Sequence, residues 1–263
     1  MRSLWGRRAF MWAFAKANVD KQKTKSRLGQ FWQVMDPVFT MALYWFLFGF
    51  LLGGRGSVAN YFGFLAAGVF SFAIIRQSIT AGSKAISSNE GLIRSIHFPR
   101  AMLPLAVVAQ NFRVYMFSIP IMVFVLLITG EPITWQWLLA PVGLGLILMF
   151  STGIAMIMAR VVGNIPDISE VLPLFLRVWG YMSGVMIPIA DRLRSLSAPP
   201  WAVILIELNP GTVYLNCMRD ALMDSYDSPG GGWNWVLAVA WAVVILPLGL
   251  WIFWRGEETY GRG

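Results

Sequence analysis

The chain has 263 residues; 57% are hydrophobic, 13% are charged, and the formal net charge is +8. Soluble domains are typically about 25% charged, so this composition argues against a soluble domain and favours a membrane protein. The single cysteine, Cys217, excludes an internal disulfide and a zinc site built from cysteines.

Residues 1–30 are basic and rich in aromatic side chains, with eight Lys or Arg residues against one acid, Asp20. The positive-inside rule places this end in the cytoplasm. The mixture of Trp, Phe and Met with cations is typical of an amphipathic helix in the headgroup layer, and its charge argues against a cleavable signal peptide. We therefore expect residues 1–30 to form a cytoplasmic amphipathic interface segment.

Long apolar runs follow, and four of them contain no charged residue: 37–54, 56–75, 132–159 and 228–254. Each reaches the ~18 residues that a helix needs to cross a bilayer, where backbone groups must be paired internally. Two weaker runs, about 101–130 and 171–190, are interrupted by Arg113 and Arg177. The sequence thus predicts an all-α membrane protein with six transmembrane helices and cytoplasmic N- and C-termini.

The loop between the second and third spans holds the sequence "SNEGLIRSIHFPR" at residues 88–100. Its first residues are a helix start signal, and Pro99 disfavours a helical conformation in the residue before it. The short helix would expose apolar side chains to the cytoplasm, namely Leu92, Ile93, Ile96 and Phe98. Exposed apolar clusters mark partner surfaces, so we expect this helix to dock on a cytoplasmic protein, with His97 as a polar contact.

About 40 residues separate the fifth and sixth spans, far more than an ordinary connection needs. The segment "PPWAVILIELNP" is apolar but too short to cross, and Pro210 breaks it after Asn209. We expect two short re-entrant outer helices over residues 195–224 that form a gate. Asn209 would fix the hinge by hydrogen bonds, and Arg219 would anchor to headgroups or to an outer acid. A static cap is the alternative.

Three motifs occur in one order: "SRLGQFWQVMDP" at 26–37, "GLIRSIHFPRAMLPL" at 91–105 and "LNPGTVYLNCMRDAL" at 208–222. With the span count, they resemble the permease subunits of type-2 exporters of the ATP-binding-cassette (ABC) superfamily. The resemblance is closest to exporters of polysaccharide on a polyprenyl-diphosphate carrier: O-antigen, teichoic acid and cell-wall galactan exporters. Residues 31–263 would then form one six-span permease domain.

The resemblance implies a bacterial plasma-membrane protein that pairs with a second copy of itself and with two copies of a cytoplasmic ATPase. ATP and Mg would bind the ATPase, and this chain would carry no cofactor, no metal and no catalytic residue. The coupling segment that touches the ATPase would comprise Gly91, Leu92, Ile93, Arg94, Ile96, His97, Phe98, Pro99 and Arg100. The basic residues flank spans and form no separate domain, so we expect no nucleic-acid partner.

Several side chains are candidates for contact with substrate or membrane lipids. Lys23, Lys25 and Arg27 would attract the carrier diphosphate at the cytoplasmic entrance. Aromatic residues within spans would line the conduit: Tyr44, Trp45, Trp179 and Tyr181. Arg113 and Arg177 are costly in a bilayer, so they should face protein or water; they either guide diphosphate or make structural hydrogen bonds.

Two other functions stay open. The first is a type-2 exporter of drugs or lipids. The second is an intramembrane polyprenyl-lipid transferase, which would need acids for its chemistry, whereas Asp36, Asp167 and Glu170 are expected only at span edges. The Gly82-Ser83-Lys84 sequence lacks the remainder of a P-loop, so we do not expect ATP hydrolysis by this chain.

Overall fold

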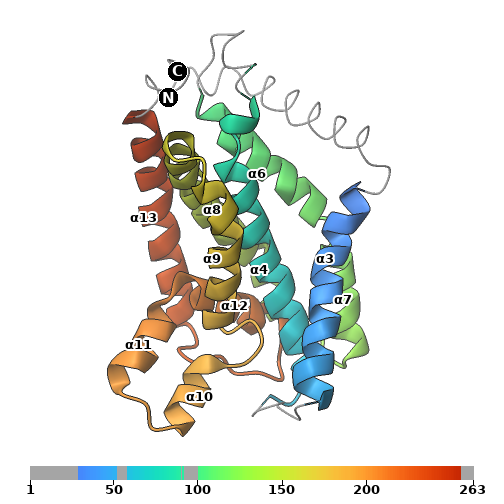
Figure 1. Cartoon of the computed structure of the whole chain (residues 1–263). Helices are drawn as coiled ribbons and strands as arrows, with labels where there is room; N and C mark the ends of the chain where they lie inside the picture. The colour runs from blue at the N-terminus through green and yellow to red at the C-terminus, as the bar shows by residue number, and fades with distance from the viewer. Residues whose placement is uncertain (1–28, 52–57, 90, 92–99, 256–263) are drawn as a thin grey trace.

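The computed structural model describes residues 29–51, 58–89, 91 and 100–255, and within these ranges the only regular elements are helices. Figure 1 shows α4, α8, α9 and α13 running along one another, with α3 and α7 to one side of α4 and with α10 and α11 at one end. The predicted all-α class is therefore confirmed for the part of the chain that the structure describes.

Five helical stretches are long and apolar enough to cross a membrane, in agreement with five of the six predicted spans. They comprise α3 (Gly29–Tyr44) with a π-helix (Trp45–Leu51), α4 (Tyr61–Ser83), α6 (Met102–Tyr115) with α7 (Ile119–Ile128), a 3-10 turn (Trp135–Leu139) with α8 (Ala140–Asn164), and α13 (Trp233–Arg255). The chain is thus a multi-pass membrane protein.

The expected span at 171–190 is not of that length. It forms α9 (Ile168–Met182), whose 15 residues rise only about 22 Å at 1.5 Å per residue. The helix ends because Gly184 adopts a left-handed conformation, with φ of 77°, which a glycine accepts without steric cost. Five membrane-crossing helices, rather than six, are therefore established among the described residues.

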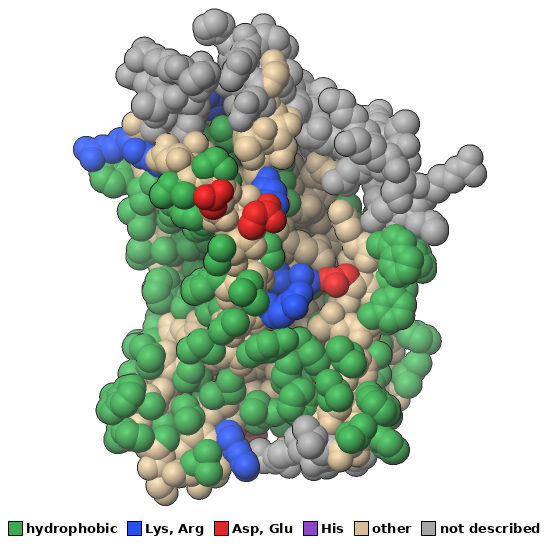
Figure 2. All heavy atoms as spheres, viewed as in Figure 1, with side chains coloured by type: hydrophobic (Ala, Val, Ile, Leu, Met, Phe, Trp, Pro, Cys, Tyr) green, Lys and Arg blue, Asp and Glu red, His purple; other side chains and the backbone are tan. Residues whose placement is uncertain are grey.

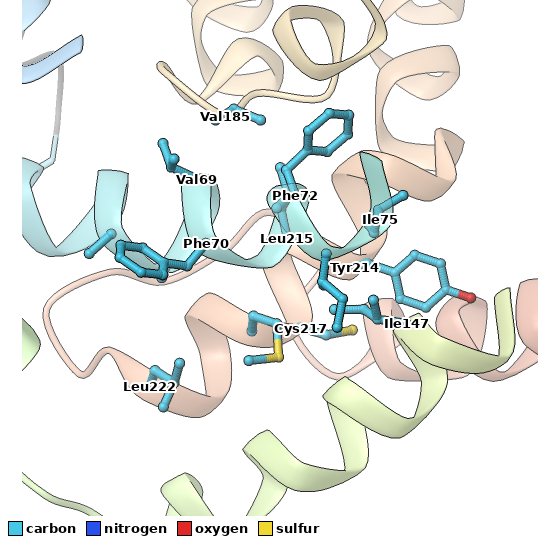
Figure 3. Packing of buried hydrophobic residues seen from close by; sticks show 14 of the residues in the cluster. Val69, Phe70, Phe72, Ile75, Ile147, Val185, Tyr214, Leu215, Cys217 and Leu222 are labelled. Atoms are coloured by element: carbon cyan, nitrogen blue, oxygen red, sulfur yellow. The ribbon is translucent and has the colours of Figure 1, made fainter. Parts of the chain in front are cut away.

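Helix α4 lies at the centre of the bundle, and nearly all of its side chains are buried. It packs against α3, α6, α7, α8, α9 and α12. Figure 3 shows its side chains, including Phe70, Phe72 and Ile75, packed with Ile147 and with Tyr214 and Leu215 from elsewhere in the chain. Because lipid is as apolar as this core, close packing is what distinguishes the interior from the surroundings.

Two glycines bring α8 and α13 into direct backbone contact. A Cβ atom on Gly153 would lie 2.4 Å from the carbonyl oxygen of Ile245, and one on Gly249 would lie 2.3 Å from the carbonyl oxygen of Gly153. Small residues allow such close approach of membrane helices. This crossing fixes α13 against the core.

At one end of the bundle, a buried carboxylate joins three segments. Glu131, only 3% exposed, accepts hydrogen bonds from the Asn60 side chain (2.7 Å), from the Asp224 backbone N–H (3.0 Å) and from the Ser225 hydroxyl. Asn60 also caps α4 by accepting from the Gly63 N–H at 2.9 Å. A buried acid needs such partners, and here they hold the segments around Glu131 and Asp224 to the start of α4.

The two short helices predicted over residues 195–224 are present as α11 (Pro200–Leu208) and α12 (Pro210–Leu222), and a third, α10 (Ile189–Ser195), precedes them. The expected break at Asn209 is confirmed, because this residue lies between α11 and α12 with ψ of 122°. The two arms differ sharply in burial. Almost all of α12 is buried, whereas α11 has no buried residue.

Candidate functional site

A groove of about 310 Å³ opens between α3, α4 and α9. Figure 2 shows the hollow, with basic and acidic atoms gathered inside it and hydrophobic side chains around it. Its charged and hydroxyl-bearing lining residues are Asp36, Thr40, Tyr44, Arg76, Arg177 and Tyr181.

The charged end of the groove contains two arginines and one acid. Arg76 of α4 forms an ion pair with Asp36 of α3, and the two side chains are 32% and 46% exposed. Arg177 of α9 has no ion-pair partner among the residues that the structure describes. The groove thus holds one more positive than negative charge, in a part of the molecule where charge is costly without partners.

The expectation that Asp36 lies at a span edge is wrong. It lies seven residues after the start of α3, about 10 Å along the helix axis, and it contributes to the groove. The sequence did not identify Arg76 and Asp36 as intramembrane charges, because each lies beside an uncharged run and not inside it. Arg76 follows the run 56–75, and Asp36 precedes the run 37–54. Spanning helices extend beyond their uncharged runs, as α3 and α4 do. Charged residues that directly flank such a run are therefore also candidates for intramembrane charges.

The other end of the groove is aromatic. Tyr44 of α3 and Tyr181 of α9 meet edge to face, with ring centroids 6.3 Å apart. Tyr181 lies one turn beyond Arg177 on α9, and Tyr44 lies two turns beyond Asp36 on α3. The groove therefore changes from charged to aromatic along its length, an arrangement that suits a ligand with an anionic group and a less polar remainder.

Both outer walls of the groove are irregular helices. Pro37 lies inside α3, and the same segment continues beyond Tyr44 as a π-helix. Pro173 lies inside α9. An internal proline removes one hydrogen bond of the helix and favours a kink, and π-helical turns are frequent at functional sites. The walls are therefore less constrained than α4, which forms the floor.

The Asn209 side chain bonds the break between α11 and α12 to the end of α9. Its side-chain oxygen accepts from the Trp179 indole N–H (2.8 Å) and from the Gly211 backbone N–H (3.1 Å), and its amide donates to the Ser183 hydroxyl (3.1 Å). Gly211 has no room for a larger residue, since a Cβ atom would lie 2.1 Å from the Ser183 oxygen. The hinge at Asn209–Pro210 is thus bonded to the same helix that forms one wall of the groove.

Arg219 does not anchor to headgroups, because it is only 1% exposed. Its guanidinium donates to the carbonyl of Gly184 (2.9 Å) and, more weakly, to that of Val185 (3.4 Å), and it lies 3.5 Å from the centre of the Phe64 ring. Burial lowers the pKa of Arg219 to about 10, which still leaves it charged at neutral pH. The sequence predicted that Arg219 lies at a polar surface, but its guanidinium instead bonds to the turn that follows α9.

Only half of the predicted conduit residues line the groove: Tyr44, Arg177 and Tyr181. Trp45 packs on Phe62 with ring centroids 5.8 Å apart, and the indole of Trp179 bonds to Asn209. Arg113 is exposed in the last turn of α6, which contributes nothing to the groove.

Two predicted regions lie outside the described residues. They are the entrance residues, Lys23, Lys25 and Arg27, and the coupling residues Leu92, Ile93, Arg94, Ile96, His97, Phe98 and Pro99. The two ends of the coupling segment are described. Gly91 is exposed with open space around its Cα atom, and Arg100 is partly buried just before α6.

Comparison with known proteins adds an independent line of argument. A profile of the family described as "ABC-2 type transporter" matches residues 10–223. The O-antigen export system permease protein RfbA of Myxococcus xanthus is 25% identical over 214 residues, which are 80% of this chain and 78% of the relative. The polysialic acid transport protein KpsM of Escherichia coli is 25% identical over 241 residues, 89% of this chain and 88% of the relative. The chain therefore belongs to the ABC-2 type transporter family, as a membrane subunit for transport rather than an enzyme.

Proposed function

We propose that the chain exports a polysaccharide linked to polyprenyl diphosphate from the cytoplasm across the bacterial plasma membrane. An ABC-2 permease implies a partner ATPase subunit, which would bind ATP and Mg and drive transport. The names of the relatives, for O-antigen export and polysialic acid transport, support a glycan rather than a drug as cargo. Membership of a permease family argues against the intramembrane transferase.

The groove between α3, α4 and α9 is the observation that carries this proposal. Arg76 and Arg177 are suited to a diphosphate, because a guanidinium donates two parallel hydrogen bonds to phosphate oxygens. The aromatic end at Tyr44 and Tyr181 offers flat apolar faces against which sugar C–H groups can slide. We infer that the carrier diphosphate binds the charged end and that the attached glycan passes the aromatic end.

We further propose that α9 completes a sixth crossing and that both termini face the cytoplasm. The ends of α4, α8 and α13 gather at the end of the bundle opposite α10 and α11 (Figure 1), and Lys84, Arg160 and Arg255 lie there. This distribution agrees with the positive-inside rule. The re-entrant turn at Gly184 and the short helices α10 and α11 would then fill the outer leaflet beyond the end of α9.

The proposed assembly contains two copies of this chain and two ATPase subunits. Residues 31–263 form the permease domain, and residues 1–30 form the interface segment whose Lys23, Lys25 and Arg27 attract the diphosphate. Residues 91–100 dock on the ATPase. Large apolar side chains of α3 and α9 are exposed on either side of the groove, including Phe39, Phe175 and Val178, and they provide a surface for the second copy.

The outer gate is restricted to α11 in this proposal, because α12 is part of the core. The C-terminal end of α11 is held to α13 by a hydrogen bond from the Trp241 indole to the Leu208 carbonyl, at 3.1 Å. A bifunctional thiol reagent that joins Leu208→Cys to Trp241→Cys, in a Cys217→Ser background, should stop export until the link is cleaved. Full export with the link in place would identify a static cap.

The transport function is tested by Arg76→Gln and Arg177→Gln, each compared with Arg192→Gln. Arg192 is an exposed arginine of α10 outside the groove, so it controls for loss of a positive charge. We expect the two groove variants to lower export at least about tenfold at equal protein abundance, since one charge-assisted hydrogen bond contributes about 1.5–3 kcal/mol. Lipid-linked glycan would accumulate inside the cell. Normal glycan export by both variants would contradict the groove as the diphosphate site, and normal glycan export by cells that lack the chain would favour the drug or lipid exporter instead.

A further inference from the structure

We propose that Asp36 is a counter-ion that the diphosphate must displace from Arg76, so that substrate binding itself releases α3 from α4. This inference rests on the proposed function, because it takes the groove to be the diphosphate site. It assigns a role in ligand selection and opening to an acid that the comparisons leave without one.

The first argument is the position of the ion pair. Asp36 and Arg76 both line the groove, so the pair occupies the place where an anionic ligand would meet the floor arginine. In the empty groove the carboxylate supplies the negative charge that Arg76 needs in an apolar setting. A diphosphate brings one negative charge on each phosphate, which is enough to engage both Arg76 and Arg177 without the carboxylate.

The second argument is the exposure of the pair. The Asp36 side chain is 46% exposed and that of Arg76 is 32% exposed, and ion pairs that exposed contribute little to stability. The pair is therefore weak enough for a ligand to break. The buried Glu131, with backbone and side-chain donors around it, shows how a permanent carboxylate site of this chain is built.

The third argument is the helix that carries Asp36. Pro37 follows it directly, and a π-helix begins at Trp45, so α3 has a weakened hydrogen-bond pattern on both sides of the groove contact. Most of α3 is exposed, whereas α4 is almost wholly buried. Loss of the Asp36–Arg76 pair would therefore move α3 rather than the floor, and the groove would widen between α3 and α9.

A mono-anionic or neutral lipid makes fewer charge–charge contacts with the arginines when it breaks the Asp36–Arg76 ion pair. With one negative charge it can replace Asp36 at Arg76 or engage Arg177, but it leaves the other arginine or the carboxylate without a partner. The pair thus selects for ligands with two adjacent negative charges. The chemistry shared by the possible ligands is phosphate on a lipid, so carrier diphosphate and bulk phospholipid must be separated by experiment.

The test is calorimetric titration of the full chain, in nanodiscs of phosphatidylcholine, with farnesyl diphosphate as the probe. Asp36→Asn should bind the probe about fivefold more tightly than the wild type, because the competing ion pair is gone. Asp167→Asn is the matched control: it removes the same charge from the start of α9, outside the groove, and its affinity should be unchanged. Arg177→Gln should bind more weakly than the wild type.

The possible outcomes distinguish the counter-ion role of Asp36 from the proposed diphosphate site. Equal or weaker binding by Asp36→Asn, or an equal gain in Asp167→Asn, would overturn the counter-ion role, while weak binding by Arg177→Gln would leave the proposed function standing. If the wild type binds no farnesyl diphosphate, both proposals fail. A fivefold gain for phosphatidylglycerol as well would keep the displacement but contradict selection for a diphosphate, and it would assign the groove to bulk lipid headgroups.

Discussion

Two arginine sites of this chain illustrate two ways of keeping a guanidinium inside a membrane protein. Arg219 is 1% exposed, donates to two backbone carbonyls and lies over the Phe64 ring. Arg76 and Arg177 instead line an open groove, where one has a half-exposed acid as its partner and the other has no ion-pair partner among the described residues.

The difference separates structure from function. Arg219 donates from one guanidinium nitrogen to the carbonyls of Gly184 and Val185, and its Nε, which has no hydrogen-bond partner among the described residues, is buried away from any ligand. The groove arginines retain donors that the fold does not use. We conclude that burial and partners distinguish a structural intramembrane charge from a binding one, whereas charge alone, which is all the sequence offers, does not.

The largest effect is expected at the structural site. Arg219→Met should lower the free energy of unfolding by about 3 kcal/mol, because it leaves two buried carbonyls without a donor and removes a charged hydrogen bond. The chain contains its own probe, since Cys217 is its single cysteine and is fully buried. A thiol-reactive dye should therefore label Arg219→Met at a lower temperature than the wild type, and identical melting of the two would refute the structural role.

A smaller effect is expected from crowding the same arginine. A Cβ atom on Gly68 would lie 2.5 Å from the Arg219 guanidinium and 3.1 Å from the Val185 carbonyl, so Gly68→Ala should cost about 1–3 kcal/mol of stability. Gly145→Ala provides the control, because a Cβ atom at Gly145 meets nothing within 4 Å. The same melting assay should show a loss only for Gly68→Ala, and equal melting of both variants would mean that Arg219 can rearrange freely.

The smallest stability effect is expected in the groove. Arg177→Gln should change the free energy of unfolding by no more than about 0.5 kcal/mol, the range for exposed substitutions, although export falls. Melting by Cys217 labelling checks this directly. A loss as large as that of Arg219→Met would make Arg177 a structural residue, and the distinction between the two sites would disappear.

The sequence predicted the parts of the fold that depend on long uncharged apolar runs. The strong apolar runs became α3, α4, α8 and α13, and Pro210 ended α11 at the predicted hinge. The fifth predicted span is shorter than expected, because the residues after Met182 are apolar but include Gly184, whose left-handed backbone turns the chain. No pattern in a single sequence shows that almost all of α12 is buried. Arg219 was therefore predicted to lie at a polar surface, whereas it lies in the core.

The candidate site could be predicted only in part, for a similar reason. Tyr44, Arg177 and Tyr181 were found because they interrupt or lie within apolar runs. Asp36 and Arg76 lie where such runs end, and they come from helices whose pairing requires the tertiary structure. Trp179 shows the converse error, since an aromatic residue inside a span was expected to face the conduit and instead bonds to Asn209.

The central claim, that the groove between α3, α4 and α9 carries the lipid-linked glycan, is tested most directly by photo-cross-linking in living cells. Leu43 lines the groove and is 54% exposed, and Val243 is 56% exposed on α13, away from the groove. A photoreactive amino acid is placed at position 43 or at position 243, and cross-linking is carried out while the cells synthesise glycan. We expect the cross-linked chain to carry glycan when the photoreactive residue is at position 43 and to carry none when it is at position 243. Equal amounts of glycan at the two positions, or glycan at neither, would contradict it.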